Sequence, residues 1–154
     1  MPKINFKVEG MEQLQKSFKK LGQVPQKHVT SSVRKAMRIP LNKAKGDAPI
    51  RTGALVKGMI DVRENSSKKA KSVRRIVFDR NMNDIFQKPN KEGKITGYYP
   101  VSQEYGFFAK NGRYIPGFRF ISDSFIESKL QIEKTIVSEM QKRMDAEIVK
   151  AGLK

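Results

Sequence analysis

Apolar and polar residues alternate at the start of the chain in two different periods. Residues 4–8 alternate with a period of two, which is typical of a half-buried strand. Over residues 11–21 the apolar side chains return every three or four positions, and Gly22 follows where a helix commonly ends. The pattern therefore predicts an amphipathic strand and then a short amphipathic helix.

A longer run with helical spacing extends over residues 25–48 and contains a proline. Pro40 has no N–H to donate and its ring clashes with the preceding turn, at a cost of about 3 kcal/mol unless the helix bends. We therefore expect a kinked helix, or two stacked helices. Pro49 ends the run, and Thr52 is placed to act as the N-cap of a further short helical turn.

Two stretches rich in β-branched residues, 59–63 and 72–79, predict strands. The polar run 64–71 joins them, so an antiparallel hairpin is the economical arrangement. Residues 81–97 read as a long polar connection, longer than a link between neighbouring elements needs to be. Both 64–71 and 81–97 are expected to be flexible loops that could reorder on assembly.

The aromatic side chains concentrate between residues 98 and 120, with a polar turn at 110–113. They could be stacking platforms for single-stranded nucleic acid, but packing between the last helix and the sheet is the simpler interpretation. From Ile121 onward, apolar residues mark one face of a long helix. The chain is thus predicted to be one α+β domain, residues 1–154: a small antiparallel sheet, a long kinked helix in the N-terminal half, and a long C-terminal helix packed on it.

The composition removes several classes of chemistry. Cysteine is absent, which excludes disulfides, thiolate nucleophiles and cysteine zinc sites. A single histidine, His28, leaves one candidate general base, and it is expected to be a solvated surface residue. Asp61 and Asp79 could face each other across the hairpin, although pairing with neighbouring cations is the more economical role. With no nucleotide-binding glycine motif, we expect no enzyme activity, no cofactor and no metal.

No apolar run reaches the length of a membrane span, and the start of the chain does not resemble a signal peptide, so we expect a protein of the cytoplasm, at least at first. The 32 basic and 15 acidic side chains give a net charge of +17, which points to nucleic acid or an acidic protein as partner. All of this excess lies in residues 1–122. The densest cluster, a candidate DNA- or partner-facing site, consists of Lys68, Lys69, Lys71, Arg74 and Arg75.

Several short motifs follow one another in a fixed order. A Gly-Met-Glu-Gln-Leu segment follows the first strand, and Ala-Pro-x-x-Thr-Gly-Ala-Leu stands at 48–55. Glu-Tyr-Gly follows at 104–106, and Phe-Arg-Phe-Ile leads into the last helix. In this order they resemble the head–tail joining, or tail completion, family of long-tailed bacteriophages. The positions that carry the resemblance are Pro49, Thr52, Gly53, Leu55, Glu104, Gly106 and Phe118.

The resemblance implies a structural subunit of the neck of a virion. Such a subunit would form a homo-oligomeric ring, expected to be hexameric or similar, between the head-side connector and the tail proteins. The DNA would pass close by in the lumen, and no cofactor, membrane or enzyme activity is implied. The alternative, from the charge alone, is a basic protein that binds nucleic acid without sequence preference.

Overall fold

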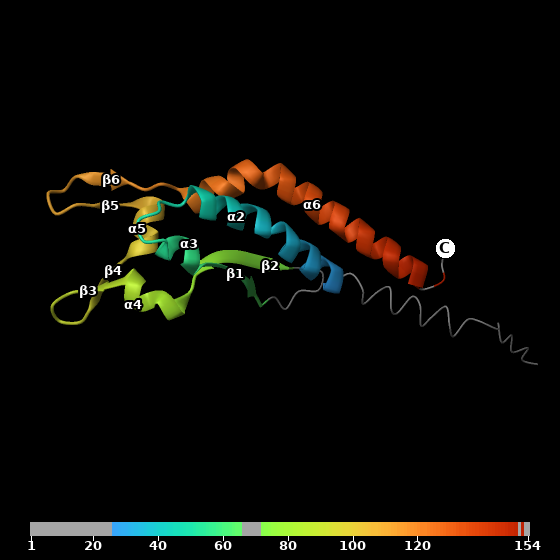
Figure 1. Cartoon of the computed structure of the whole chain (residues 1–154), viewed down its shortest axis with the longest axis horizontal. Coiled ribbons are helices and arrows are strands. Elements are labelled where there is room, and N and C mark those ends of the chain that lie inside the picture. Colours follow the sequence, from blue (N-terminus) through green and yellow to red (C-terminus); the bar gives the residue numbers. More distant parts are fainter. Residues whose placement is uncertain (1–25, 66–71, 151, 153–154) are drawn as a thin grey trace, which may run out of the picture.

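The computed structural model describes residues 26–65, 72–150 and 152. It is elongated, with two long helices side by side, a hairpin beneath them and two short hairpins projecting from one end (Figure 1). The strand expected at 4–8, the helix expected at 11–21 and most of the 64–71 connection lie outside the described residues.

The predicted kink is confirmed. Residues 26–36 are helical, and after a turn at Met37 the helix continues as α2, Arg38–Asp47. Backbone bonds from Met37 to Val33, at 2.9 Å, and from Leu41 to Met37, at 3.2 Å, carry the chain through the bend. Pro40 has no N–H for the Ala36 carbonyl, and both residues are buried. The bend therefore has the local cause that the sequence predicted.

The C-terminal helix α6, Phe120–Lys150, runs along α2, and both helices use small residues where they meet the rest of the fold. Ala44 of α2 and its C-cap residue Ala48 are buried, as are Ser124 and Ser128 of α6. Small side chains let two helices approach closely. The first core cluster joins Ala44 and Ala48 to Met59 and Phe120, so the start of α6 also touches the sheet.

The predicted hairpin is confirmed as β1, Met59–Glu64, paired antiparallel with β2, Val73–Phe78. Its register places Asp61 opposite Ile76. The suggested facing of Asp61 and Asp79 is therefore wrong. The Asp79 carboxylate instead accepts a bond from the Asn81 N–H at 3.0 Å and caps the short 3-10 helix η1, Arg80–Met82.

Residues 81–97, expected to be one long connection, form further elements. After η1 come α4, Asn83–Phe86, and the antiparallel strands β3, Gln87–Pro89, and β4, Ile95–Tyr98. The physical reason is Phe86, which is buried in a second core cluster with Ala54 and Leu55. Its ring also meets those of Phe78 and Tyr98 edge-on, at centroid distances of 5.5 and 6.0 Å. Phe86, with Met82 packed against the same cluster, anchors this polar stretch to the body.

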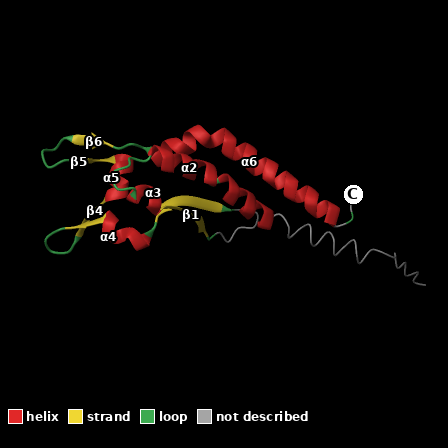
Figure 2. Ribbon diagram, viewed as in Figure 1, coloured by secondary structure: helices red, strands yellow, loops and turns green. Residues whose placement is uncertain are grey.

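The remaining elements are α3, Ala54–Gly58, α5, Tyr99–Tyr105, and the antiparallel pair β5, Gly106–Phe108, and β6, Tyr114–Pro116. The turn predicted at 110–113 joins β5 to β6. The α+β class is as predicted, with the strand pairing divided among three separate two-stranded sheets (Figure 2). The hairpins β3–β4 and β5–β6 project from the same end of the molecule (Figure 1).

Candidate interaction surfaces

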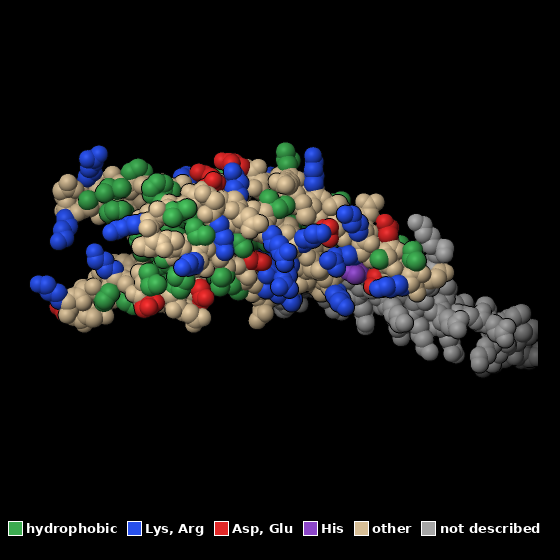
Figure 3. Space-filling model, in the orientation of Figure 1, with side chains coloured by type: hydrophobic (Ala, Val, Ile, Leu, Met, Phe, Trp, Pro, Cys, Tyr) green, Lys and Arg blue, Asp and Glu red, His purple; other side chains and the backbone are tan. Residues whose placement is uncertain are grey.

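Cationic side chains from three distant parts of the chain meet on one face. We call this the basic surface, and Lys and Arg side chains gather on that part of the molecule in Figure 3. It consists of two adjoining shallow depressions that share Ser31 and Arg34. The cations that line them are Lys27, Arg34, Lys35, Arg38, Arg63 and Arg143.

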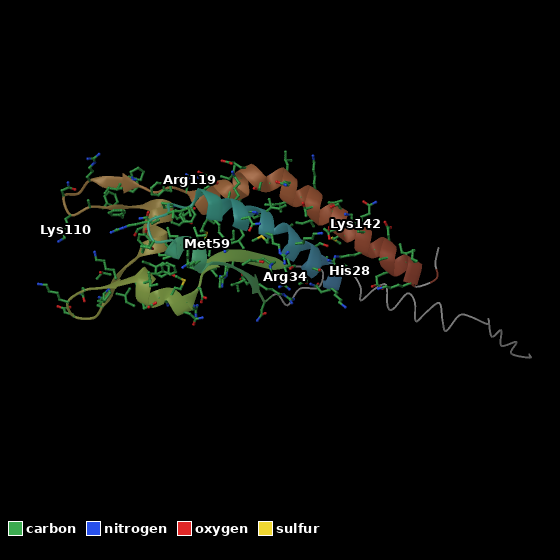
Figure 4. The ribbon with its side chains drawn as sticks, in the orientation of Figure 1. His28, Arg34, Met59, Lys110, Arg119 and Lys142 are labelled. Atoms are coloured by element: carbon green, nitrogen blue, oxygen red, sulfur yellow. The ribbon has the colours of Figure 1, made fainter. Side chains whose placement is uncertain are left out.

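Helical spacing explains part of this convergence, and tertiary packing explains the rest. Lys27, Arg34 and Arg38 are seven and four residues apart, so they share one side of the bent helix. Arg63 comes from β1, and Arg143 comes from the C-terminal half of α6. Figure 4 shows Arg34 on the bent helix and Lys142 on α6.

Among the described residues, one buried carboxylate offsets this charge. Glu139 accepts a hydrogen bond from the Lys35 ammonium at 2.6 Å, and Lys142 and Arg143 each lie 4.0 Å from its carboxylate oxygens. The Lys35 bond holds the pKa of Glu139 below its ordinary value, with further attraction from Lys35, Lys142 and Arg143, while burial opposes the shift. The bond between Lys35 and Glu139 thus links the bent helix to α6 at one edge of the basic surface.

Three further cations of the surface have no counter-charge among the residues that the structure describes. Arg34, Arg38 and Arg63 form no ion pair with any residue in the described part of the chain. Like charges four apart on a helix, as at Arg34 and Arg38, destabilise it by about 0.2–0.5 kcal/mol. A surface that retains this repulsion has charge available for an anionic partner.

The cluster proposed from sequence does not coincide with this surface. Lys68, Lys69 and Lys71 lie outside the described residues. The Arg74 guanidinium is engaged by Asp61, through bonds of 2.8 and 2.9 Å from Nε and a 2.7 Å contact from Nη2, and its side chain is only 9% exposed. Arg75 is exposed, and on the hairpin it stands opposite Val62. Arg74 therefore holds the hairpin together, and Arg75 alone of the described pair is free to meet a partner.

Sequence reasoning missed the basic surface, although a signal for part of it was present. The spacing of Lys27, Arg34 and Arg38 within one predicted helix was enough to place three cations on one side. Nothing in the sequence could add Arg63 and Arg143, because they arrive through the packing of β1 and α6.

The expectation that His28 is a solvated surface residue is wrong. Its side chain is buried, and its Nε2 atom lies 4.0 Å from a carboxylate oxygen of Glu147 on α6. The helix face that carries His28 is turned toward the C-terminal half of α6, which one helix alone cannot reveal. Within the described part of the chain no cluster of three or more His, Cys, Asp or Glu side chains is placed to hold a metal ion.

The β5–β6 hairpin, residues 106–116, is the second candidate surface, and we call it the arm. Its base is fastened to the fold by bonds from Phe118 to the Gln103 carbonyl, at 2.8 Å, and from Arg119 to the Glu104 carbonyl, at 3.0 Å. Gly106 has a φ of +88°, and a Cβ there would collide with the carbonyl oxygen of Ile115. Gly106 is therefore required where the two strands of the arm leave the body.

Glu104, beside that glycine, caps the long helix. Its carboxylate accepts hydrogen bonds from the N–H groups of Ile121 and Ser122, at 2.9 and 2.8 Å, and from the Ser122 hydroxyl at 2.6 Å. An acid at this position satisfies N–H groups that have no partner within the helix, and it meets the positive end of the helix dipole. The Glu-aromatic-Gly motif thus joins the arm to α6.

The arm exposes apolar side chains that the sequence led us to place in the core. Phe120 is buried as expected, but Phe108 is 75% exposed and Tyr114 is 49% exposed, with their rings 5.3 Å apart. Phe107 and Ile115 are also exposed, and Phe118 at the base is 61% exposed. The interpretation of these aromatics as core packing is therefore wrong for the arm, which extends beyond the body with no other described element packed against it.

The Ala-Pro-x-x-Thr-Gly-Ala-Leu segment builds the junction between α2 and α3. Pro49 is half-buried after the end of α2, and Gly53, with a φ of +74°, is the N-cap residue of α3. This corrects the prediction for Thr52, whose hydroxyl accepts only a long bond, 3.4 Å, from the Ala54 N–H. Leu55 is buried in the second core cluster. These residues serve structure, since none of them lines the basic surface.

Comparisons with known proteins add nothing to these observations: no family model, no curated protein and no solved structure matched the chain. None of the described helices has the length and apolar character needed to cross a membrane.

Proposed function

We propose that this chain is a structural subunit of a phage head–tail connector, which assembles into a ring around the DNA channel and joins the head-side connector to the tail. The ordered sequence motifs support the proposal. Two of them also have a physical role in the fold, because Glu104 caps α6 and Gly53 begins α3. In the assembled particle the protein belongs to the virion, after synthesis in the host cytoplasm.

The apolar side chains exposed on both faces of the arm carry the proposal: Phe107 and Ile115 pair on one face, and Phe108 and Tyr114 pair on the other. A lone two-stranded hairpin is marginally stable in water, and this one presents Phe107, Phe108, Tyr114 and Ile115 to solvent. Contiguous exposed apolar groups mark surfaces that meet another protein. A subunit that buries its arm against a neighbour gains stability that an isolated chain lacks.

The mass of the purified protein, measured by light scattering over a wide concentration range, tests the proposal. We expect a concentration-dependent increase toward a closed oligomer, with rings visible by electron microscopy. We also expect little binding to nonspecific duplex DNA at physiological salt. A protein that stays monomeric at every concentration and binds nonspecific duplex DNA tightly at physiological salt would contradict the connector role.

The basic surface favours a second candidate function, nucleic-acid binding without sequence preference. From Lys27 to Arg38 the bent helix advances about 16 Å, at 1.5 Å per residue. Duplex DNA advances about 3.4 Å per base pair along its axis, so this row of cations would follow roughly five base pairs of phosphates. Such contacts would be electrostatic and strongly dependent on salt.

Charge reversal on the basic surface tests this second function. For the doubly substituted Arg34→Glu/Arg38→Glu variant we expect a loss of DNA affinity of more than tenfold at low salt and a shallower dependence on salt. The matched control is Lys91→Glu/Lys94→Glu, which makes the same change of charge at the exposed tip of the β3–β4 hairpin. Equal losses in both variants would assign the binding to net charge rather than to the basic surface.

A further inference from the structure

The side of α6 that faces away from α2 carries a row of exposed apolar residues. Ile126, Leu130 and Val137 are 66%, 70% and 64% exposed. Their separations of four and seven residues place them on one side of the helix, about half a turn from the buried Ser124 and Ser128. We call these three residues the α6 stripe, and within the described residues nothing covers it.

A carboxylate without a partner lies within the α6 stripe. Glu133 is exposed between Leu130 and Val137, and it forms no ion pair with a described residue. The acids before it along the helix are engaged: Asp123 with Arg119, at 3.3 Å, and Glu127 with Lys43, at 2.8 Å. In a chain with 32 basic side chains, Glu133 is an acid left available for a cation from elsewhere.

The arm combines exposed aromatic rings with positive charge. Phe108 and Tyr114 present their exposed rings beside the tip, where Lys110 and Arg113 supply two positive charges and residues 106–116 contain no acid. Neither cation forms an ion pair within the described part of the chain. The arm is therefore apolar and positive, whereas the α6 stripe is apolar with one unpaired carboxylate, Glu133, between the exposed Lys129 and Lys134.

The arm cannot reach the stripe of its own chain. It leaves the junction near residues 117–119 toward one end of the molecule, and α6 leaves the same junction toward the other end (Figure 1). Four extended residues from Gly106 to Lys110 reach about 13 Å, and the stripe from Ile126 to Val137 is about 16 Å long. The two surfaces are of similar length, and they can meet only between molecules.

We propose that the arm of one subunit docks on the α6 stripe of a neighbouring copy, with Phe108 against Leu130 and the cations of the tip beside Glu133. This inference rests on the proposed ring assembly and identifies the contact that would build it. The two sides of the contact are different surfaces, so each subunit uses its arm on one neighbour and its stripe on the other. Such a head-to-tail contact gives a ring when the rotation closes and a filament when it does not.

The absence of cysteine allows a direct test in the full chain. The double variant Phe108→Cys/Leu130→Cys should form a ladder of disulfide-linked oligomers under mild oxidation, and reduction should collapse it to monomer. A mixture of the two single variants should give a cross-linked dimer, and each single variant alone should not. The control pair Phe108→Cys/Val149→Cys keeps a similarly exposed site on α6, 60% against 70% for Leu130 and away from the stripe, and should form at least tenfold less cross-linked product.

A charge exchange provides a second measurement in case cysteine disturbs the arm. Arg113→Glu and Glu133→Arg should each weaken self-association about tenfold or more in sedimentation, and the double variant should recover most of the loss. Oligomers that form without selective cross-linking and without this recovery would overturn the arm-to-stripe contact while leaving ring assembly intact. A chain that never oligomerises would overturn the assembly proposal itself, and with it this contact.

Discussion

The carboxylate of Glu104 accepts two hydrogen bonds from Ser122, one from its N–H at 2.8 Å and one from its hydroxyl at 2.6 Å. The two residues belong to different elements, α5 and α6, and Glu104 is only 3% exposed. A buried acid is tolerated here because the first turn of α6 presents N–H groups that need acceptors. The base of the arm and the start of the longest helix are thereby held as one unit.

Removing the Glu104 carboxylate should destabilise the protein strongly. Glu104→Ala leaves buried N–H groups of Ile121 and Ser122 without acceptors, and we expect a loss of about 2–4 kcal/mol in the free energy of unfolding. Glu104→Gln keeps one acceptor oxygen and should cost less. Urea unfolding measures both, with the exposed Glu133→Gln as the control that should change little. One hydrogen bond contributes about 1 kcal/mol to stability. A Glu104→Ala protein whose free energy of unfolding lies within about 0.5 kcal/mol of the control would therefore contradict the capping role.

Two glycines of the arm allow a matched comparison of backbone effects. Both Gly106 and Gly112 have positive φ, 88° and 78°, but a Cβ at Gly112 meets open space whereas one at Gly106 meets the Ile115 carbonyl. Gly112→Ala should cost about 1 kcal/mol, from conformation alone. Gly106→Ala should cost more and should displace the arm, visible as loss of the exposed-arm amide signals in NMR spectra. Equal effects of the two substitutions would argue against the close approach at Gly106.

Breaking the ion pair between Asp61 and Arg74 should destabilise the protein far more than removing an exposed charge nearby. Their side chains are 12% and 9% exposed, so Asp61→Asn would leave a nearly buried guanidinium without its counter-charge. We expect a destabilisation of about 3 kcal/mol, against less than about 0.5 kcal/mol for Arg75→Gln on the exposed side of β2. Thermal unfolding of the two variants tests this, and a mild effect of Asp61→Asn would show that the hairpin does not depend on the pair.

The lowered pKa of Glu139 predicts a specific dependence of stability on acid. Because the folded protein holds this carboxyl below its ordinary value of 4.5, its stabilising contribution is present above that value and is lost as the pH falls through the lower folded pKa. Unfolding midpoints measured from about pH 6 to about pH 2 should therefore fall less steeply for Glu139→Gln than for the unsubstituted protein. Lys35→Met should flatten the curve in the same way, since the Lys35 bond is the main cause of the shift. Parallel curves would contradict that assignment.

The elements with a local cause could be predicted from the amino-acid pattern. Pro40 bends its helix because it cannot donate to a carbonyl one turn back, and the polar turn at 110–113 reverses the chain between two strands. The strand pair around 59–78 and the long helix after residue 120 follow from the spacing of apolar residues over short windows. Each of these depends on neighbours along the chain, so a linear pattern is sufficient to predict it.

Which side chains meet could not be predicted in this way, because it depends on how the elements pack. Phe86 organises residues around it because Leu55 and Phe78 surround its ring, and Arg74 is engaged because the hairpin register brings Asp61 beside it. The same packing gathers Arg34, Arg63 and Arg143 on one face and leaves the aromatic residues of the arm exposed. Burial and charge pairing depend on which faces the packing brings together. The period of a helix or strand predicts which residues share a face, but it does not predict what that face will contact.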